Sequence, residues 1–221
     1  MTEAKALSDT DEPLDAATEE ALTASVAQAV TTESGEGSAD GAASAEPADS
    51  DAASESPDGP RALTLYFLRH ADAGDPMAWT ADDAERPLSK KGRRQAKRLA
   101  RLLKDLDVEV DSILTSPKVR ASATAKIAGR GVGRKPVVDE RLTIEFGTDV
   151  LTALVAALDS DVGSVMLVGH DPDFTDAVSW LAGAHITMRK GALAVIDLPD
   201  REAGAGRGSL RWLLPPDAVA G

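Results

Sequence analysis

The chain has 221 residues, of which 37 are acidic and 24 basic, and it contains no cysteine. The missing cysteine excludes a disulfide framework, a thiol nucleophile and a cysteine-ligated metal site. The net charge of −13 argues against nucleic-acid binding over the whole surface, and no apolar run approaches the roughly 18 residues of a transmembrane helix. No secretory signal is recognisable at the N-terminus, so we expect a cytoplasmic protein with no membrane or nucleic-acid partner.

Charge divides the chain near residue 60. Residues 1–60 hold 15 acidic side chains and one lysine, a net charge of −14, whereas 61–221 hold 22 acidic and 23 basic residues. The first part has no aromatic residue, so it cannot bury enough apolar surface to offset the entropy lost on ordering. We therefore expect a disordered acidic tail over 1–60 and one folded domain over 61–221.

The first half of this domain alternates strand and helix. The apolar run 62–68 predicts a buried strand, and Ser89 suits the N-cap of an amphipathic helix that ends near Asp107. A second short strand is predicted over 112–115. The following helix is expected over 118–128.

Glycines and short apolar runs mark the remaining elements. Gly129 and Gly131 are expected beyond the end of the preceding helix. We predict a brief strand over 136–138 and a helix over 149–158. A buried strand follows over 164–168.

Pro172 then suits the first turn of a helix that stops at Gly183, and two closing strands are expected over 192–198 and 210–214. This alternation predicts an α/β domain of three layers, αβα, with a largely parallel central sheet and helices on both faces.

Basic side chains and histidines follow the ends of three predicted strands. Arg69 and His70 follow the first strand, Arg120 lies one turn into the helix after the second, and His170 follows the third after a glycine. Because ligands of parallel sheets bind beyond the carboxyl ends of the strands, we expect these four residues to share one site.

Two imidazoles and two guanidiniums indicate phosphoryl chemistry. Arginine presents a planar fork of donors that matches phosphate oxygens, and a neutral histidine can attack phosphorus and carry the phosphoryl group. The arginines already supply positive charge where it develops in the transition state, so we expect neither a metal ion nor a cofactor.

The segment Leu68–Ala71 (LRHA) resembles the signature of the histidine phosphatase superfamily, whose fold is shared with the cofactor-dependent phosphoglycerate mutases. The pattern is similar to that of the SixA-type phosphohistidine phosphatases. Five blocks agree in order and spacing: RHADA at 69–73, RPLSKKGRRQA at 86–96, SPKVRASATA at 116–125, VGHDPDF at 168–174 and MRKGALAVIDL at 188–198.

The resemblance implies a role for each of the four residues. His70 would be the nucleophile that becomes phosphohistidine, Arg69 and Arg120 would bind the phosphoryl oxygens, and His170 would complete the pocket. Ala71 departs from the commonest signature, which has glycine at this position.

The proton donor for the leaving group is left open by the sequence. The candidates are Asp72, Asp75, Asp139, Glu140 and Glu145, and none lies in a motif that identifies it. An alkoxide leaving group needs a positioned acid, whereas a phosphohistidine imidazole can arrive already protonated. The missing motif therefore favours a phosphohistidine substrate.

The function that we expect is a metal-independent phosphatase that removes phosphate from a phosphorylated protein of the histidine phosphotransfer type. The alternatives are a phosphomonoesterase that acts on small phosphorylated substrates and a module that binds phosphate without catalysis. A phosphoglycerate mutase is disfavoured, because nothing between Arg69 and Arg120 is long enough to cover the site and exclude water.

Overall fold

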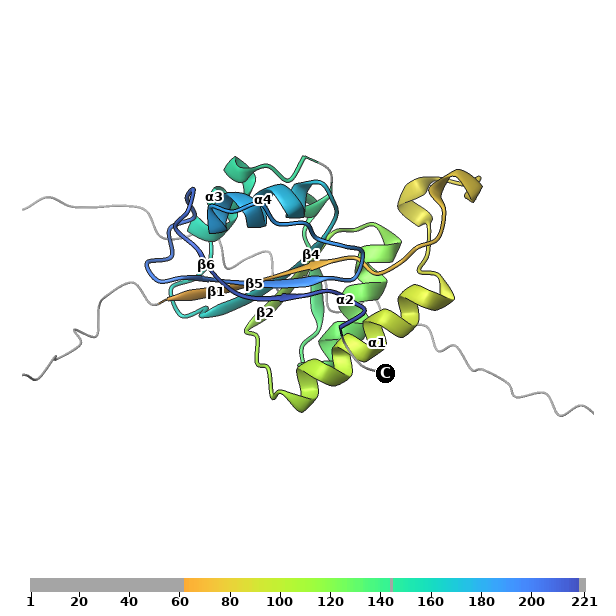
Figure 1. Ribbon diagram of the computed structural model, residues 1–221, viewed down its shortest axis with the longest axis horizontal. Coiled ribbons are helices and arrows are strands. Elements are labelled where there is room, and N and C mark those ends of the chain that lie inside the picture. Colours follow the sequence, from red (N-terminus) through yellow and green to blue (C-terminus); the bar gives the residue numbers. More distant parts are fainter. Residues whose placement is uncertain (1–61, 144, 219–221) are drawn as a thin grey trace, which may run out of the picture. The chain divides into compact units, whose positions relative to one another are not determined.

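Six strands form one sheet in the part of the chain that the computed structural model describes, residues 62–143 and 145–218. They are β1 (Leu63–Arg69), β2 (Ser112–Thr115), β3 (Pro136–Val138), β4 (Ser164–Gly169), β5 (Leu193–Leu198) and β6 (Ser209–Leu214). Their order is β3-β2-β4-β1-β5-β6 (Figure 1). The first four strands along the chain run parallel, β5 is antiparallel to β1, and β6 is antiparallel to β5, which confirms the expected largely parallel sheet.

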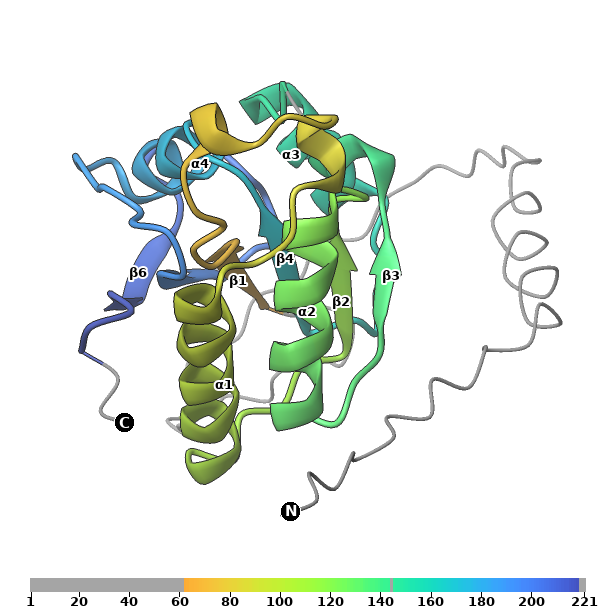
Figure 2. The same cartoon turned by 90° about the vertical axis from the view of Figure 1, so that its right-hand side faces the viewer.

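Helices cover both faces of the sheet, as the alternation of elements predicts. The helices α1 (Lys90–Asp105) and α2 (Val119–Gly131) lie side by side on one face, and α3 (Thr148–Ala156) and α4 (Asp173–Ala182) lie on the other (Figures 1 and 2). Three short 3-10 turns complete the described part: η1 (Pro76–Ala78), η2 (Asp83–Glu85) and η3 (Glu140–Leu142). The three-layer αβα architecture is confirmed.

The central strand β1 is buried on both faces, which is why apolar residues dominate its sequence and fill it continuously from Leu65 to Leu68. Leu65 and Phe67 point to the cluster that α3 and α4 complete, for instance through Phe174. Tyr66 and Leu68 point to the cluster that α1 and α2 complete. The sheet therefore packs between two separate apolar layers. Helices on both faces hold the edge at which the parallel strands have their carboxyl ends.

The helix α1 begins where the sequence predicts. The Ser89 side chain accepts a hydrogen bond from the Gly92 amide at 3.0 Å and so satisfies one of the free donors of the first turn. The buried face carries Ala96, Leu99 and Leu103, whereas most of the basic residues are exposed.

The predicted end of the next helix is wrong. Gly129 and Gly131 lie inside α2, which continues to residue 131, instead of beyond its end. A Cβ atom at Gly131 would overlap the backbone carbonyl of Ala100 in α1, and one at Gly129 would overlap the carbonyl of Arg134. These glycines therefore allow a close approach of backbones, and Gly133, with φ of +68°, makes the turn.

The last helix ends where the sequence predicts, because Gly183 adopts the left-handed conformation with φ of 61°. Pro172 occupies the N-cap position of α4, one residue before the first turn in which the sequence predicts it. The expectation of disorder over residues 1–60 lies outside the described residues and stays a prediction. None of the helices in the described ranges is long and apolar enough to cross a membrane.

Candidate active site

The two histidines that follow strand ends meet at the carboxyl edge of the sheet. Arg69 of β1 lies opposite Gly169 of β4 in a parallel pair, so His70 and His170 leave the sheet side by side. Their ring centroids are 5.2 Å apart. A Cβ atom at Gly169 would overlap the ring of Phe174, so glycine is needed here for the close approach of α4.

The second strand adds Ser116 and Arg120 to the same edge. Thr115 of β2 lies opposite Val168 of β4, so the start of α2 stands next to His170. Arg120, in the first turn of α2, is 5% exposed. The structure therefore brings Arg69, His70, Arg120 and His170 together, as expected from their places after strand ends.

The surroundings of His70 leave one of its ring nitrogens unprotonated. Its Nδ1 atom lies 2.8 Å from the carbonyl oxygen of Ala71, which can only accept, so Nδ1 carries the hydrogen. The other nitrogen, Nε2, accepts a hydrogen bond from Arg120 Nε at 3.3 Å. Burial and the nearby cations Arg120, Arg69 and Lys190 lower the pKa of His70 to about 4, although the bond to Ala71 opposes this shift. His70 is thus a neutral imidazole at physiological pH.

His170 is also a neutral imidazole. Its Nε2 atom lies 2.8 Å from the Ser116 hydroxyl, whereas Nδ1 is buried and has no hydrogen-bond partner among the described residues. Burial, followed by the charges of His70 and Arg120, lowers its pKa to about 3. The unpartnered nitrogen is a buried polar atom that a bound group could satisfy.

Arg69 is anchored by the backbone and by a carboxylate. Its Nη1 atom donates to the carbonyl oxygen of Met188 at 2.5 Å and lies 3.3 Å from Asp171 Oδ2. Its Nε atom is buried and has no partner among the described residues. The guanidinium is therefore held in place while keeping donors for a ligand.

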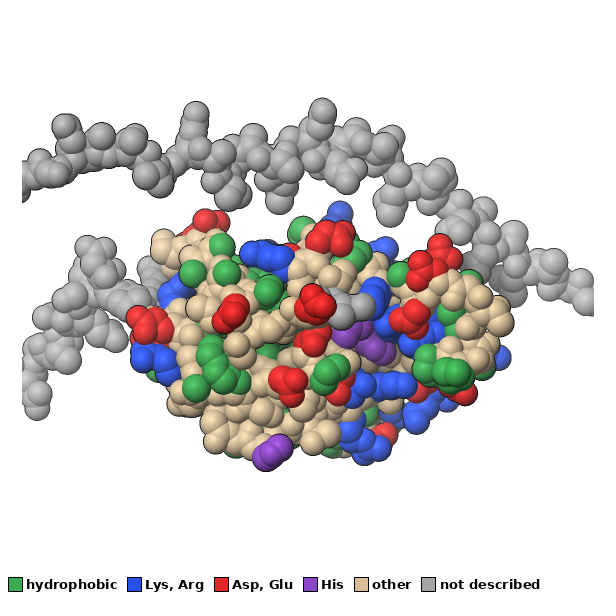
Figure 3. Space-filling model, turned by 90° about the horizontal axis from the view of Figure 1, so that it is seen from above, with side chains coloured by type: hydrophobic (Ala, Val, Ile, Leu, Met, Phe, Trp, Pro, Cys, Tyr) green, Lys and Arg blue, Asp and Glu red, His purple; other side chains and the backbone are tan. Residues whose placement is uncertain are grey.

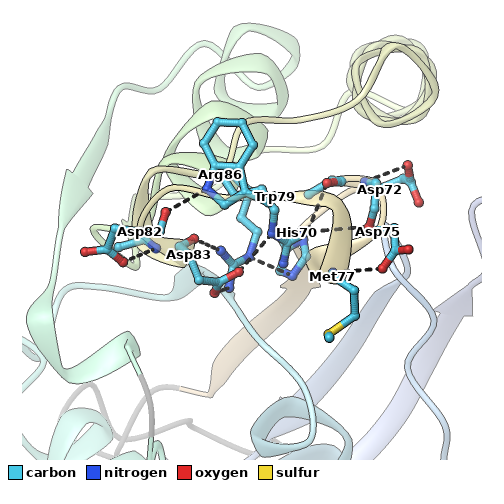
Figure 4. A network of polar contacts seen from close by, with 12 residues as sticks. His70, Asp72, Asp75, Met77, Trp79, Asp82, Asp83 and Arg86 are labelled. Carbon is cyan, nitrogen blue, oxygen red and sulfur yellow. Dashed lines mark hydrogen bonds and ion pairs between the residues drawn. The ribbon is translucent and has the colours of Figure 1, made fainter.

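Asp83 of η2 positions two arginines, and no sequence signal points to it. Arg120 donates from Nη1 to the Asp83 carbonyl oxygen at 2.6 Å and from Nη2 to the Asp83 carboxylate at 2.8 Å. Arg86 binds the other carboxylate oxygen through Nε at 2.8 Å. Figure 4 shows Asp83 and Arg86 beside His70. The hydrogen bond from Arg86, together with the charge of Arg120, holds the pKa of Asp83 below its usual value.

These side chains surround a cavity of about 340 Å³. It is lined by Arg69, His70, Pro76, Arg86, Lys118, Arg120, Thr143, His170, Asp171, Pro172, Asp173 and Lys190. Near the centre of Figure 3, purple histidine atoms lie in a hollow with Lys and Arg side chains beside them, apart from a second purple side chain at the lower edge. Five cations against two carboxylates make the cavity suitable for a phosphoryl group.

The five carboxylates proposed from the sequence as proton donors do not line this cavity. Asp72 accepts from Ser89 at 2.5 Å, Asp75 caps η1, and Asp139 pairs with Arg141 at 2.7 Å. Glu140 and Glu145 are exposed.

Asp171 and Asp173 line the cavity instead. Burial raises the pKa of Asp173, which makes it the better proton donor of the two, because Asp171 is paired with Arg69. Both closely follow His170, so their place after a strand end is a signal that could have identified them. Asp83 carries no such signal, because it lies in a loop far from any strand end.

Within residues 62–143 and 145–218, no three His, Asp or Glu side chains are grouped so that they could hold a metal ion.

The chain is similar to known proteins in sequence and in fold. The family model of the histidine phosphatase superfamily (branch 1) matches residues 65–151. An uncharacterized protein of Picosynechococcus is 31% identical over 171 residues, which are 69% of this chain and 100% of that protein. Phosphohistidine phosphatase SixA of Escherichia coli is 26% identical over 159 residues, which are 70% of this chain and 94% of that protein.

A solved structure of the protein histidine phosphatase SixA with tungstate superposes with a TM-score of 0.63 at 26% identity. The superposition covers 72% of this chain and 100% of that chain.

Proposed function

The chain belongs to branch 1 of the histidine phosphatase superfamily and is SixA-like, and we propose that it hydrolyses protein phosphohistidine through a covalent intermediate on His70. One observation carries this proposal. The unprotonated Nε2 of His70 accepts a hydrogen bond from Arg120 Nε at 3.3 Å in a cavity rich in cations, so a phosphoryl group bound to the Arg120 guanidinium would lie next to the nucleophilic nitrogen.

In the first step, His70 Nε2 attacks phosphorus while the bond between phosphorus and the substrate imidazole breaks. The electron pair of that bond stays on the leaving nitrogen. Arg69 and Arg120 donate hydrogen bonds to the equatorial oxygens, where charge develops, and His170 closes the other side of the pocket. A substrate imidazole that carries a proton on its second nitrogen leaves as a neutral ring, without a proton donor from the enzyme.

In the second step, water attacks phosphorus and the bond to His70 Nε2 breaks. The electron pair returns to Nε2, orthophosphate leaves, and the proton lost by the water passes to solvent or to a phosphate oxygen. The low pKa of His70 favours this step, since it reduces the basicity of the leaving nitrogen.

A second candidate function is the hydrolysis of small phosphate monoesters. It is favoured by Asp173, a cavity carboxylate whose pKa is raised by burial and which could protonate an ester oxygen. The similarity to SixA favours the protein substrate. The cytoplasmic location stays a prediction from the sequence.

The experiment that tests the proposal measures phosphate release by the full-length chain, with EDTA present, from two substrates. One is a histidine phosphotransfer domain phosphorylated on its histidine, and the other is p-nitrophenyl phosphate. We expect rapid dephosphorylation of the domain and its loss in His70→Ala. Turnover of the ester alone would favour the monoesterase, and release from neither would favour a phosphate-binding module.

A further inference from the structure

A second cavity, of about 310 Å³, lies beside the first. The two share Arg69 and Lys190 as a common wall. The other residues that line the second cavity are Asp72, Lys91, Gln95, Arg189, Pro216 and Asp217. A molecule whose phosphoryl group enters the first cavity therefore places its neighbouring groups over the second.

The net charge of the second cavity is positive, because four cations line it, Arg69, Lys91, Arg189 and Lys190, against the two carboxylates of Asp72 and Asp217. Asp217 is paired with Arg189 at 3.2 Å. Lys91 and Lys190 have no ion-pair partner within the described ranges. Two lysines thus remain available to an anion.

A buried amide adds a directed donor to these lysines. Gln95 is 6% exposed, and its Oε1 atom accepts a hydrogen bond from the Asp72 amide at 3.0 Å. This bond holds the side chain and leaves its NH₂ group as the donor that Gln95 can offer to the second cavity. An amide donor that lines a cavity together with two unpaired lysines suits a carboxylate.

Basic side chains continue from the second cavity along α1. Four of them repeat at positions i, i+3, i+7 and i+10 and so lie on one side of the helix. This basic stripe consists of Lys91, Arg94, Arg98 and Arg101. None of the four pairs with a carboxylate of the described residues. The stripe is too long for a small metabolite and fits an extended acidic surface.

We propose that the second cavity and the basic stripe bind carboxylates on the surface of the phosphoprotein substrate, so that the enzyme selects phosphohistidines that lie in an acidic surface. This inference rests on the proposed function. Lys91 and Gln95 bind the carboxylate nearest the phosphohistidine, and the stripe binds those farther away. Charge complementarity of this kind mainly accelerates association and depends on salt.

The test uses the full-length chain and a matched pair of phosphorylated histidine phosphotransfer domains. One domain has carboxylates around its phosphohistidine, and in the other these are changed to amides. We expect kcat/KM to be about tenfold higher for the acidic domain at low salt and the difference to shrink at about 0.5 M salt. Lys91→Glu should remove the preference without changing the turnover of p-nitrophenyl phosphate.

Lys104→Glu is the matched control, because it makes the same charge change on the same helix about 20 Å farther along the axis. It should keep the preference to within about twofold. Equal kcat/KM values for the two domains, or equal effects of the two substitutions, would overturn the docking surface while leaving the proposed function intact.

Two further outcomes distinguish a protein-docking surface from different uses of the same lysines and arginines. Hydrolysis of p-nitrophenyl phosphate without hydrolysis of either domain would overturn the proposed function, and the inference with it. If Lys91→Glu instead abolishes binding to phosphatidylserine vesicles and leaves the domain kinetics unchanged, the surface serves a membrane and the inference is wrong.

Discussion

His70 is buried and has three cationic neighbours. Both features disfavour the charged imidazolium and so lower the pKa of His70. We expect its imidazole to titrate at a pH near 4 and that of His170 near 3, both far below the ordinary value of about 6.5. A ¹H–¹⁵N NMR titration of the full chain checks this, with His70→Gln to assign the signal. Titration of His70 at pH 6 or above would contradict the electrostatic account of the nucleophile.

Asp173 offers a way to separate the two candidate reactions at one residue. An alkyl phosphate releases an alkoxide that needs a proton, whereas a protonated phosphohistidine does not. We expect Asp173→Asn to lower the turnover of an alkyl phosphate about 10²-fold and to change phosphohistidine turnover less than about threefold.

The control is Asp161→Asn, an exposed carboxylate that does not contribute to the pKa shift of Asp173, and it should affect neither substrate. Equal losses on both substrates in Asp173→Asn would show that Asp173 acts on binding or on folding and not as an acid.

How much of the site the sequence predicts depends on where each residue lies. Arg69 ends β1, and His70 and His170 directly follow strand ends; the geometry of parallel strands brings residues at these positions together whatever the conformation of the loops. Asp83 lies in a loop, and its position depends on how that loop folds back over Arg120. Contacts of this kind are made by tertiary structure and leave no periodic pattern.

Among the helices and strands too, the sequence predicts the features that depend on local signals and misses those that depend on tertiary contacts. The apolar run of β1 and the capping serine of α1 are local signals, and both are confirmed. The predicted end of α2 is wrong because a glycine can either stop a helix or admit a neighbouring backbone. Which of the two roles the glycine takes depends on where α1 packs. The residues near Gly131 in the sequence do not predict that position.

The contact between α1 and α2 gives a prediction at the scale of elements. Gly131→Ala places a methyl group against the carbonyl of Ala100, so the helices must move apart. We expect a loss of about 1–3 kcal/mol in the free energy of unfolding, although alanine is the better helix former. Urea unfolding of the full chain measures it.

Gly163→Ala is the matched substitution, because a Cβ atom there meets only ordinary contact, with Asp111 at 3.6 Å. Its free energy of unfolding should stay within about 0.5 kcal/mol of the parent. Similar losses for both glycines would mean that the approach of the two helices is not what requires Gly131.

The whole molecule should lose stability in mild acid through its buried histidines. The pKa of His70 is lowered in the folded state, so the unfolded chain binds more protons between pH 4 and 6.5 and stability falls as the pH falls through this range. The loss from this residue is roughly 3 kcal/mol. Urea unfolding at several pH values measures it.

His70→Gln removes the titrating group, so its stability should depend less on pH across the same interval. A variant whose stability follows the parent curve would place the acid sensitivity elsewhere, for instance on the carboxylates that form ion pairs.

The carboxylate of Asp83 also bears on how a catalytic cycle ends. It already neutralises part of the charge of Arg86 and Arg120, so orthophosphate competes with a resident anion for the same guanidiniums. When orthophosphate departs, Arg86 and Arg120 keep the Asp83 carboxylate as an ion-pair partner. Their guanidinium charges are therefore not left unpaired. We therefore expect inhibition by orthophosphate to be weak.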